Sequence, residues 1–261
     1  MDKMNFKIAE DDFEIFYKEN TQSTNIDVRK MAENGAKEGT VVIADSQTGG
    51  KGTRGRSFSS PKGTGLYMSL LLRPELEFSK ALSITCAASV AVCRAIEQIS
   101  GEKVYIKWVN DIYSEDNKKL CGILTEAVLN DDNCSVKYAV LGIGINVFEP
   151  DGGFSDEIKD IAGAVFKNEE KNDELKQKLT KCVLKEFWRL YEKLLKGTFL
   201  EEYRQRSCIL GKKIDVIKDN LKKSAVALEI NDDFSLKVRF SDGSEETLYS
   251  GDVSIKKITK N

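Results

Sequence analysis

The segment from Gly49 to Pro61, GGKGTRGRSFSSP, places three cations among four glycines and contains no acidic residue. Glycines allow backbone N–H groups to approach an anion closely, and lysine and arginine donate charge-assisted hydrogen bonds to it. The three cations are Lys51, Arg54 and Arg56. The pattern indicates a loop that binds an anion such as a phosphate. The residues alone are also compatible with a solvated surface loop.

The same glycines partly match two phosphate-binding motifs. Gly50, Gly52 and Gly55 fit the dinucleotide fingerprint G-x-G-x-x-G, and Gly55, Arg56 and Ser57 approach the end of the phosphate loop G-x-x-x-x-G-K-[S/T]. Both motifs need a helix directly after the glycines, because the helix N-terminus holds the phosphates. Here SFSSPKGTG follows, and its proline and glycines predict no helix. We therefore exclude both motifs.

The composition limits the chemistry further. The 261 residues include no histidine, which excludes His-activated nucleophiles, imidazole acid–base catalysis and His-ligated metals. Lysine, arginine, carboxylates, amides and hydroxyls must do any chemistry. A net charge of −2 argues against general nucleic-acid binding. The six cysteines lack the paired spacing of a zinc site, and we expect them to be structural.

The elements that must position this loop predict an α+β fold. Apolar spacing and turn residues predict helices over 23–35 and 79–100, short strands over 40–44 and 66–72, and β-rich runs over 104–114, 119–129 and 135–147. We expect a mixed sheet with helices packed on one face. Ser23 or Thr24 would cap the first helix, with Thr24 and Asp27 as a capping-box-like pair. The residues before Ser23 are predicted to be a short, acidic, partly extended lead-in.

The C-terminal part has a different pattern. Helices are predicted over 172–196 and 198–207, and short strands separated by polar turns follow from Leu210. Four or five strands in about fifty residues are typical of a small β-barrel. We place the domain boundary near Cys208, giving domains over 1–207 and 208–261.

The sequence also bears on location. We find no apolar run of the roughly 18 residues that a membrane span needs. The first residues, MDKMNFKIAEDD, lack the apolar core of a signal peptide. We therefore expect a cytoplasmic protein.

Four motifs in order carry a family resemblance. GGKGTRGRSFSSPKGTGLYMSL, IKWVNDIY, KKLCGILTE and VLGIGINV resemble the motifs of the biotin protein ligases, and the resemblance runs from about Ser23 to the C-terminus. It implies a class II synthetase-like catalytic domain followed by an SH3-like β-barrel. It also implies an enzyme that uses ATP and Mg²⁺ to form biotinyl-5′-adenylate, and then transfers biotin to a lysine of a biotin carboxyl carrier protein. Neither step requires histidine.

The resemblance also assigns roles to individual residues. It makes Lys119, Lys107, Arg54 and Arg56 catalytic. It assigns to biotin Ser23, Thr24, Asn25, Gln47, Gly50, Lys51, Gly52, Thr53 and Lys119. It assigns to ATP or the adenylate Lys51, Arg54, Arg56, Phe58, Lys107, Asn110, Asp111 and Asn146, with Asp111 as a Mg²⁺ ligand. From the residues alone, Lys119 could be a solvated lysine, Lys107 an edge-strand lysine paired with a carboxylate, and Asp111 a turn residue.

The chain departs from the family pattern at a few positions. Many members have Arg where this chain has Thr53, and Trp where it has Phe58. The loss of a cation at Thr53 predicts weaker retention of the adenylate. Phe58 keeps an apolar wall but lacks the indole N–H.

Some members of the family also repress transcription through an N-terminal helix-turn-helix. No such module fits the residues before Ser23, so we expect a monofunctional enzyme that does not bind DNA; a homodimer is compatible with the resemblance. Two alternatives stay open: a ligase for lipoate or octanoate, and a sensor that binds biotin or a nucleotide without catalysis.

Overall fold

Two β-sheets organise the chain. The computed structural model describes residues 2–8, 11–167, 171–196, 198–218, 221–249 and 252–255. The large sheet contains β1 (Asp2–Ile8), β2 (Asp11–Thr21), β3 (Thr40–Gln47), β4 (Gly65–Leu72), β5 (Val104–Lys107), β6 (Asp111–Ser114), β7 (Lys119–Leu129) and β8 (Val136–Asn146). The small sheet contains β9 (Lys213–Lys218), β10 (Leu221–Ile230), β11 (Leu236–Phe240), β12 (Glu245–Leu248) and β13 (Asp252–Ile255). The helices are α1 (Thr24–Glu33), α2 (Leu82–Ser100), α3 (Asp173–Tyr191) and α4 (Leu200–Arg206).

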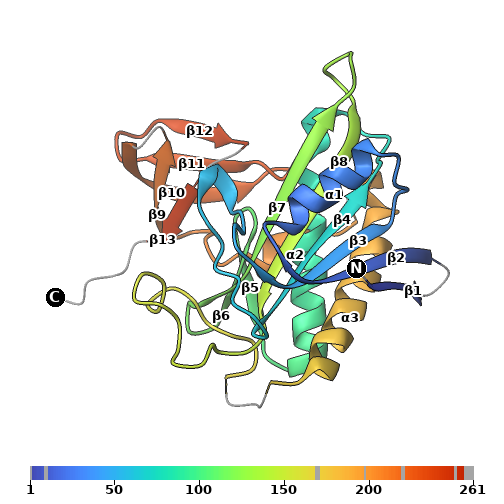
Figure 1. Cartoon of the computed structure of the whole chain (residues 1–261). Helices are drawn as coiled ribbons and strands as arrows, with labels where there is room; N and C mark the ends of the chain where they lie inside the picture. The colour runs from blue at the N-terminus through green and yellow to red at the C-terminus, as the bar shows by residue number, and fades with distance from the viewer. Residues whose placement is uncertain are drawn as a thin grey trace.

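The large sheet is mixed, as predicted. Its strand order is β1-β2-β3-β4-β8-β7-β6-β5. β2 and β3 run parallel, with α1 as the crossover between them, and the other neighbours are antiparallel (Figure 1). The α+β fold class is confirmed.

The first strands correct the prediction of a partly extended lead-in. The described residues before Ser23 include β1 and β2, which pair antiparallel, and β2 then pairs with β3. Phe13 and Ile15 are buried, although charged residues surround them in the sequence. This alternation was a strand signal, and the acidic composition concealed it.

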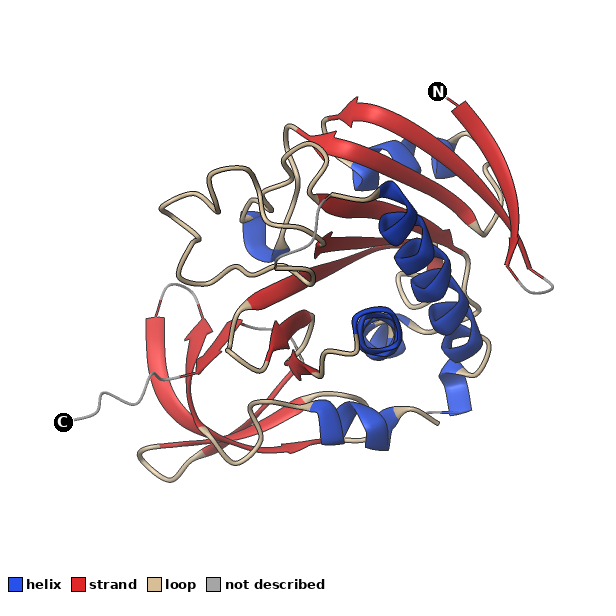
Figure 2. Cartoon of the chain, turned by 90° about the horizontal axis from the view of Figure 1, so that it is seen from below, coloured by secondary structure: helices blue, strands red, loops and turns tan. Residues whose placement is uncertain are grey.

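The helices lie on both faces of the sheet, so the prediction of a single covered face was wrong for α1. Val28 and Ala32 of α1 pack against one face, which includes Val42 and Leu71. α2 and α3 pack against the other face (Figures 1 and 2). The unbroken apolar runs in β3 and β4 follow from this, because strands buried on both faces need no polar side.

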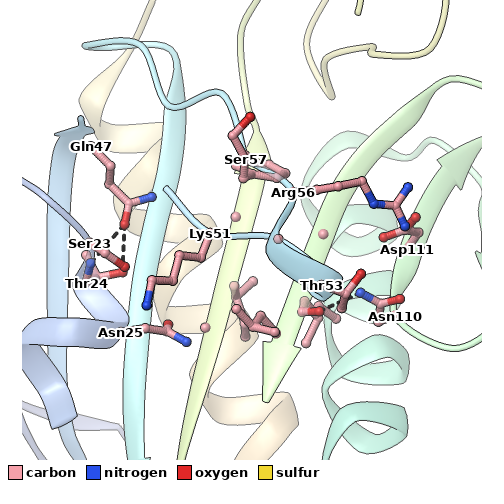
Figure 3. A pocket seen from close by; sticks show the side chains of 18 of the residues that line it. Ser23, Thr24, Asn25, Gln47, Lys51, Thr53, Arg56, Ser57, Asn110 and Asp111 are labelled. Atoms are coloured by element: carbon pink, nitrogen blue, oxygen red, sulfur yellow. Dashed lines mark hydrogen bonds between the residues drawn. The ribbon is translucent and has the colours of Figure 1, made fainter. Parts of the chain in front are cut away.

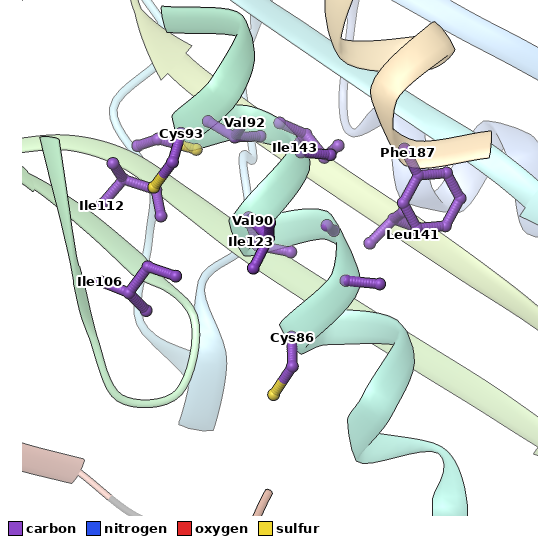
Figure 4. Close-up of a cluster of buried hydrophobic side chains, with 14 of the residues drawn as sticks. Cys86, Val90, Val92, Cys93, Ile106, Ile112, Ile123, Leu141, Ile143 and Phe187 are labelled. Carbon is purple, nitrogen blue, oxygen red and sulfur yellow. The ribbon is translucent and has the colours of Figure 1, made fainter. Parts of the chain in front are cut away.

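α2 is the central core helix. The stretch Phe78–Ser100 is long and apolar enough to cross a membrane by length and composition, so the expectation that no such run exists was wrong here. However, 72% of its apolar window is buried inside the protein. Cys86, Val90 and Cys93 of this helix are fully buried, in the apolar cluster that also includes Ile123 of the sheet (Figure 4). Burial raises the pKa of both thiols, which fits the structural role predicted for them.

The small sheet is antiparallel, with strand order β12-β11-β10-β9-β13, and supplies the predicted C-terminal β domain. Its contact with the rest of the chain includes the turn between β5 and β6. The buried Trp108 donates from Nε1 to the carbonyl oxygen of Phe234 at 2.9 Å. Phe234 also stacks on Phe199, with ring centroids 5.1 Å apart. The backbone of Cys208 donates to Ile106 at 2.9 Å, which ties the chain between the two sheets to β5.

The hydrogen bond of Trp108 gives a stability prediction. We expect Trp108→Phe to lower the free energy of unfolding by about 1–3 kcal/mol, because it leaves the buried carbonyl of Phe234 without its donor. Denaturant unfolding followed by circular dichroism measures this. Trp188→Phe, on α3, is the control for loss of an indole away from this contact. A Trp108→Phe protein as stable as wild type would contradict the expectation.

Candidate active site

A cavity of about 110 Å³ lies over the large sheet, between the glycine-rich loop and the start of α1 (Figure 3). It brings together many of the residues that the sequence predicted: Ser23, Thr24, Asn25, Gln47, Lys51, Gly52, Thr53, Arg56, Phe58, Asn110, Asp111 and Lys119. Further lining residues were not predicted from the sequence: Ser57, Met68, Gly122, Ile123, Leu124, Gly142, Ile143 and Gly144. These residues come from segments far apart in the chain, so the fold itself builds the cavity.

Three predicted residues stand apart from this lining. Gly50 is buried beneath the loop, and Lys107 and Asn146 are absent from the described cavity wall. Asn146 donates to the carbonyl of Gly163 at 3.0 Å, which gives it a structural partner. The side chain of Arg54 lies outside the described residues.

The glycine-rich loop folds back on itself as a small hairpin. Phe58 donates its backbone N–H to Gly50 at 2.8 Å, and Gly52 donates to Arg56 at 2.7 Å. A single 3₁₀ turn, Thr53–Gly55, forms the tip. The chain then continues into β4, and no helix follows the glycines. The exclusion of both phosphate motifs is confirmed.

The polar end of the cavity is built by α1 and β3. The backbone N–H of Thr24 donates to Gln47 Oε1 at 2.9 Å, and the Thr24 hydroxyl donates to the same oxygen at 3.2 Å. Gln47 Nε2 donates to the hydroxyl of Ser60 at 2.9 Å, and Ser60 donates to the carbonyl of Phe58. The orientation of the Gln47 carboxamide is therefore fixed, and it links α1 to the base of the loop.

The predicted capping box is wrong. Ser23 holds the N-cap position of α1, but its side chain makes no capping hydrogen bond. The Thr24 hydroxyl bonds to Gln47, and Asp27 accepts from the hydroxyl of Thr21 at 2.6 Å. The Thr24 hydroxyl thus bonds to a residue distant in the sequence and not to the backbone of its own helix. Ser23 and Thr24 both line the cavity.

Glycines in β7 and β8 let side chains lie directly on the sheet. A Cβ at Gly144 would come within 2.6 Å of the Phe58 ring, and one at Gly142 within 2.2 Å of Asn25 Oδ1. A Cβ at Gly122 would meet Phe58 at 3.2 Å. The alternating glycines of LGIGIN therefore permit close packing, and they were the sequence signal for this wall.

The opposite end of the cavity carries charge. Lys119 Nζ lies 2.7 Å from Asp111 Oδ1, and Figure 3 shows the Arg56 side chain beside Asp111. Asn110 makes two hydrogen bonds with the backbone of Ile123. The side-chain Nδ2 of Asn110 donates to the Ile123 carbonyl at 2.7 Å, and the backbone carbonyl of Asn110 accepts from the Ile123 N–H at 2.9 Å. This pairing fixes the turn that carries Asp111.

Lys107 lies near this charged end. Its Nζ is 3.4 Å from the Tyr113 hydroxyl and 5.3 Å from the centre of the Tyr113 ring. Burial lowers the pKa of the Lys107 ammonium, Asp111 opposes this shift, and Lys119 adds to it. Lys107 is therefore a partly desolvated cation for which an added anion would be favourable.

The cavity thus has three zones with different chemistry. A polar end offers hydroxyls and amides together with the Lys51 ammonium, which points toward Thr24 and Asn25 (Figure 3). An apolar floor includes Met68 and Ile123, and a charged end carries Lys119 and Arg56. Such a site fits a molecule with a neutral polar head, an apolar body and an anionic tail.

A bound metal would find few ligands from the protein. The described residues contain no group of three Asp, Glu, Cys or His side chains that could hold an ion. Asp111 offers a carboxylate that already pairs with Lys119. Mg²⁺ is commonly held by one or two carboxylates together with substrate phosphates, so Asp111 fits only as a ligand shared with a nucleotide.

The sequence of the segment that builds the cavity matches a known protein family. Residues 17–146 match the model of the biotin/lipoate A/B protein ligase family. This chain belongs to that family. The matched segment lies entirely within residues 1–207 of this chain. The four motifs after Ser23 lie within the matched segment or at its edge.

Individual relatives support the same membership. The bifunctional ligase/repressor BirA of Bacillus subtilis is 43% identical over 148 residues, which is 57% of this chain and 45% of that protein. The biotin--[acetyl-CoA-carboxylase] ligase of Mycobacterium tuberculosis is 30% identical over 132 residues, 49% of this chain and 47% of that protein. The matched regions therefore span about half the length of these relatives.

A solved structure extends the likeness over most of the fold. The biotin protein ligase from Aquifex aeolicus, in complex with biotin and ATP, has a TM-score of 0.71 and 25% sequence identity. The match covers 93% of this chain and 98% of that one. It includes the small C-terminal sheet as well as the large one.

The environment of Lys107 gives a prediction that needs no ligand. We expect Asp111→Asn to lower the pKa of Lys107 further, because the neighbouring carboxylate opposes the effect of burial. We expect Lys119→Gln to raise it, because a repelling cation is removed. Titration of the labelled lysine Nζ by NMR measures both shifts, and equal pKa values in the two variants would contradict the assignment.

Proposed function

We propose that this protein activates biotin with ATP to form biotinyl-5′-adenylate and pyrophosphate, and then transfers biotin to a lysine of a biotin carboxyl carrier protein. The observation that supports this most directly is the three-zone cavity. Biotin has a neutral ureido ring, an apolar body and a carboxylate, in the same order as the polar end, the apolar floor and the charged end. The family membership and the fold support the same reaction class.

The first step brings two anions together. The biotin carboxylate attacks the α-phosphorus of ATP, a new C(O)O–P bond forms, and pyrophosphate leaves. Lys119 would neutralise the reacting oxygens from the cavity wall, Arg56 would contact the phosphate, and Lys51 would contact biotin from the polar end. Lys107 would approach the same phosphate, where an anion favours its charged form.

Mg²⁺ is part of the proposal. Bound to the ATP phosphates, it would neutralise the charge that develops on them. Asp111 would be its ligand from the protein, and the phosphates and water would complete the shell. Lys119 would then exchange its pairing with Asp111 for one with the biotin carboxylate.

In the second step, the amine of the carrier lysine attacks the acyl carbon. A C–N bond forms, the bond to the phosphate oxygen breaks, and AMP leaves. We further propose a catalytic domain over 1–207 with a C-terminal domain over 208–261, a cytoplasmic location, no binding to DNA, and a homodimer as the assembly to test by light scattering.

The test is ATP–pyrophosphate exchange. We expect exchange of labelled pyrophosphate into ATP that depends on biotin and on Mg²⁺, and we expect Lys119→Ala to reduce it by about 100- to 1000-fold because an electrostatic stabiliser is lost. Exchange that depends on lipoate or octanoate instead would assign the chain to the other branch of the family. A folded protein without exchange for any of the three acids would indicate a sensor.

The neighbouring lysine provides the matched control. Lys118 Nζ donates to the carbonyl of Lys159 at 2.9 Å, and Lys118 does not line the cavity. Lys118→Ala should retain exchange within about twofold of wild type, since surface contacts of this kind contribute little. If both alanine variants exchanged at the wild-type rate, Lys119 would have no catalytic role.

Thr53 gives a second prediction about the same site. Thr53 lines the cavity at the tip of the loop. We expect Thr53→Arg to slow release of biotinyl-adenylate, because it adds a cation beside the phosphate. Ser59→Arg, in the same loop and exposed, controls for the added charge. Release is measured by chase of labelled adenylate, and an unchanged or faster rate in Thr53→Arg would contradict the expectation.

A further inference from the structure

The turn between β5 and β6 carries Lys107 and Asp111 on its two flanks. These residues face each other across the hairpin, and residues 108–110 form the turn between them. Turn residues leave the strand ladder, so their backbone groups need partners elsewhere. The contacts that hold the turn therefore determine where Lys107 and Asp111 lie.

Each residue of the turn is held by a different element. The Trp108 indole bonds to the small sheet, and Asn110 bonds to β7. The carbonyl of Val109 accepts from the hydroxyl of Tyr203, on α4, at 3.0 Å. Tyr203 thus connects α4 to the middle residue of the turn.

The hydrogen of the Tyr203 hydroxyl is directed to this carbonyl. Tyr203 is fully buried, and a buried tyrosine hydroxyl usually has a hydrogen-bond partner. A carbonyl oxygen can only accept, so the single hydroxyl hydrogen goes to Val109. Ser89 of α2 lies 3.4 Å from the same oxygen, but its own hydrogen has a nearer acceptor in the Thr85 carbonyl at 2.9 Å. Tyr203 is therefore the main donor to Val109.

α4 is itself held firmly against α2. The Arg206 guanidinium donates to both carboxylate oxygens of Glu97, at 2.8 and 2.9 Å, and its Nε donates to Glu202 at 2.9 Å. Two parallel N–H groups match a carboxylate in geometry as well as in charge. The Tyr203 ring also meets Phe234 edge-on, with ring centroids 5.6 Å apart. Both the helix and the ring that carry the hydroxyl are thus fixed.

We propose that Tyr203 is a positioning residue for the nucleotide: through Val109, it holds the turn where Lys107 and Asp111 can meet the phosphates of ATP. Tyr203 lies outside the described cavity lining. The inference rests on the proposed function, which assigns Lys107 and Asp111 to the nucleotide. Other elements, α1 and β3, build the polar end of the cavity, so loss of the hydroxyl should affect ATP and spare biotin.

Tyr203→Phe removes the hydroxyl and keeps the ring. Titration calorimetry measures binding of biotin alone, and binding of the Mg²⁺ complex of α,β-methylene-ATP at saturating biotin. In this analogue carbon replaces the oxygen between the α- and β-phosphates, so pyrophosphate cannot leave. We expect the analogue to bind about tenfold more weakly than to wild type, because the turn loses a buried hydrogen bond, and biotin to bind within about twofold. The KM for ATP in the exchange assay should rise by the same factor as the Kd of the analogue.

A different donor at the same place tests the hydrogen bond itself. Tyr203→4-aminophenylalanine, introduced by amber suppression, restores an N–H donor at the end of the ring. We expect it to recover binding of the analogue to within about threefold of wild type. A folded protein with this substitution that binds the analogue as weakly as Tyr203→Phe would overturn the proposal.

Two control variants separate positioning from stability. Tyr191→Phe, on α3, removes a hydroxyl that donates to Glu38 at 2.6 Å. Val183→Ala, at a fully buried position of the same helix, lowers stability by opening a cavity. Both should bind the analogue within about twofold of wild type when circular dichroism shows them folded, because they lie on α3 and not on α4.

Arg206→Lys reaches the turn by a second route. Lysine keeps the charge but cannot donate to both oxygens of Glu97 as a fork, so α4 is held less firmly. We expect about threefold weaker binding of the analogue and unchanged binding of biotin. Arg189→Lys is the control, because Arg189 pairs with Glu186 from an exposed position on α3. If Tyr203→Phe does not fold, wild-type binding of the analogue in Arg206→Lys would overturn the proposal.

The outcomes distinguish this proposal from the proposed function. A selective loss of analogue binding in Tyr203→Phe supports the positioning role. Analogue binding within twofold of wild type in the folded variant, or an equal loss for biotin and the analogue, would overturn it. Absence of exchange in a wild-type protein that binds both ligands would contradict the proposed reaction, while a selective loss in Tyr203→Phe would still support the positioning role.

Discussion

The cavity depends on close approach of side chains to a sheet whose strands carry glycine at the points of contact. Asn25 lies where a Cβ of Gly142 would be, and Phe58 lies where a Cβ of Gly144 would be. A side chain at either glycine would displace one of these groups from the sheet. The start of α1 and the glycine-rich loop can therefore meet over β7 and β8 only because these two positions have no side chain. The cavity is the space between the start of α1 and the loop.

Charge is the second constraint, and it is unusually simple in a protein without histidine. The charged end contains Lys119 paired with Asp111, and near it lies a partly buried Lys107, whose pKa is lowered by burial. An added anion near Lys107 would favour its charged form, because burial disfavours that form. Polarisation of the reacting oxygens by fixed cations requires no proton transfer by imidazole. The missing histidine thus agrees with the chemistry that the site can perform.

The sequence predicted the fold where local patterns dominate. The apolar spacing of α2 and the strand signals of β3 and β4 agree with the structure, and the four ordered motifs found most of the cavity. The errors arose where distant partners decide. The capping box failed because Thr24 bonds to Gln47, 23 residues away. The first strands were missed because the partners of β2, which are β1 on one side and β3 on the other, are not visible in an acidic, alternating segment.

The residues that the sequence could not reveal share one physical feature. Ser69 interrupts the apolar run YMSLLL, and a polar residue in a buried strand requires a partner. The serine in this apolar run indicates that a partner is required, but it does not identify the partner. Asn25 and Thr24 reach Ser69 only because α1 crosses the sheet. The same holds for Trp108, whose indole N–H finds Phe234 in the second sheet. Trp108 lies in the same turn as Asn110, directly before Asp111 at the start of β6. The C-terminal sheet therefore supports one end of the cavity, and the hydrogen bonds of Asn25 with Ser69 and Glu126 support the other.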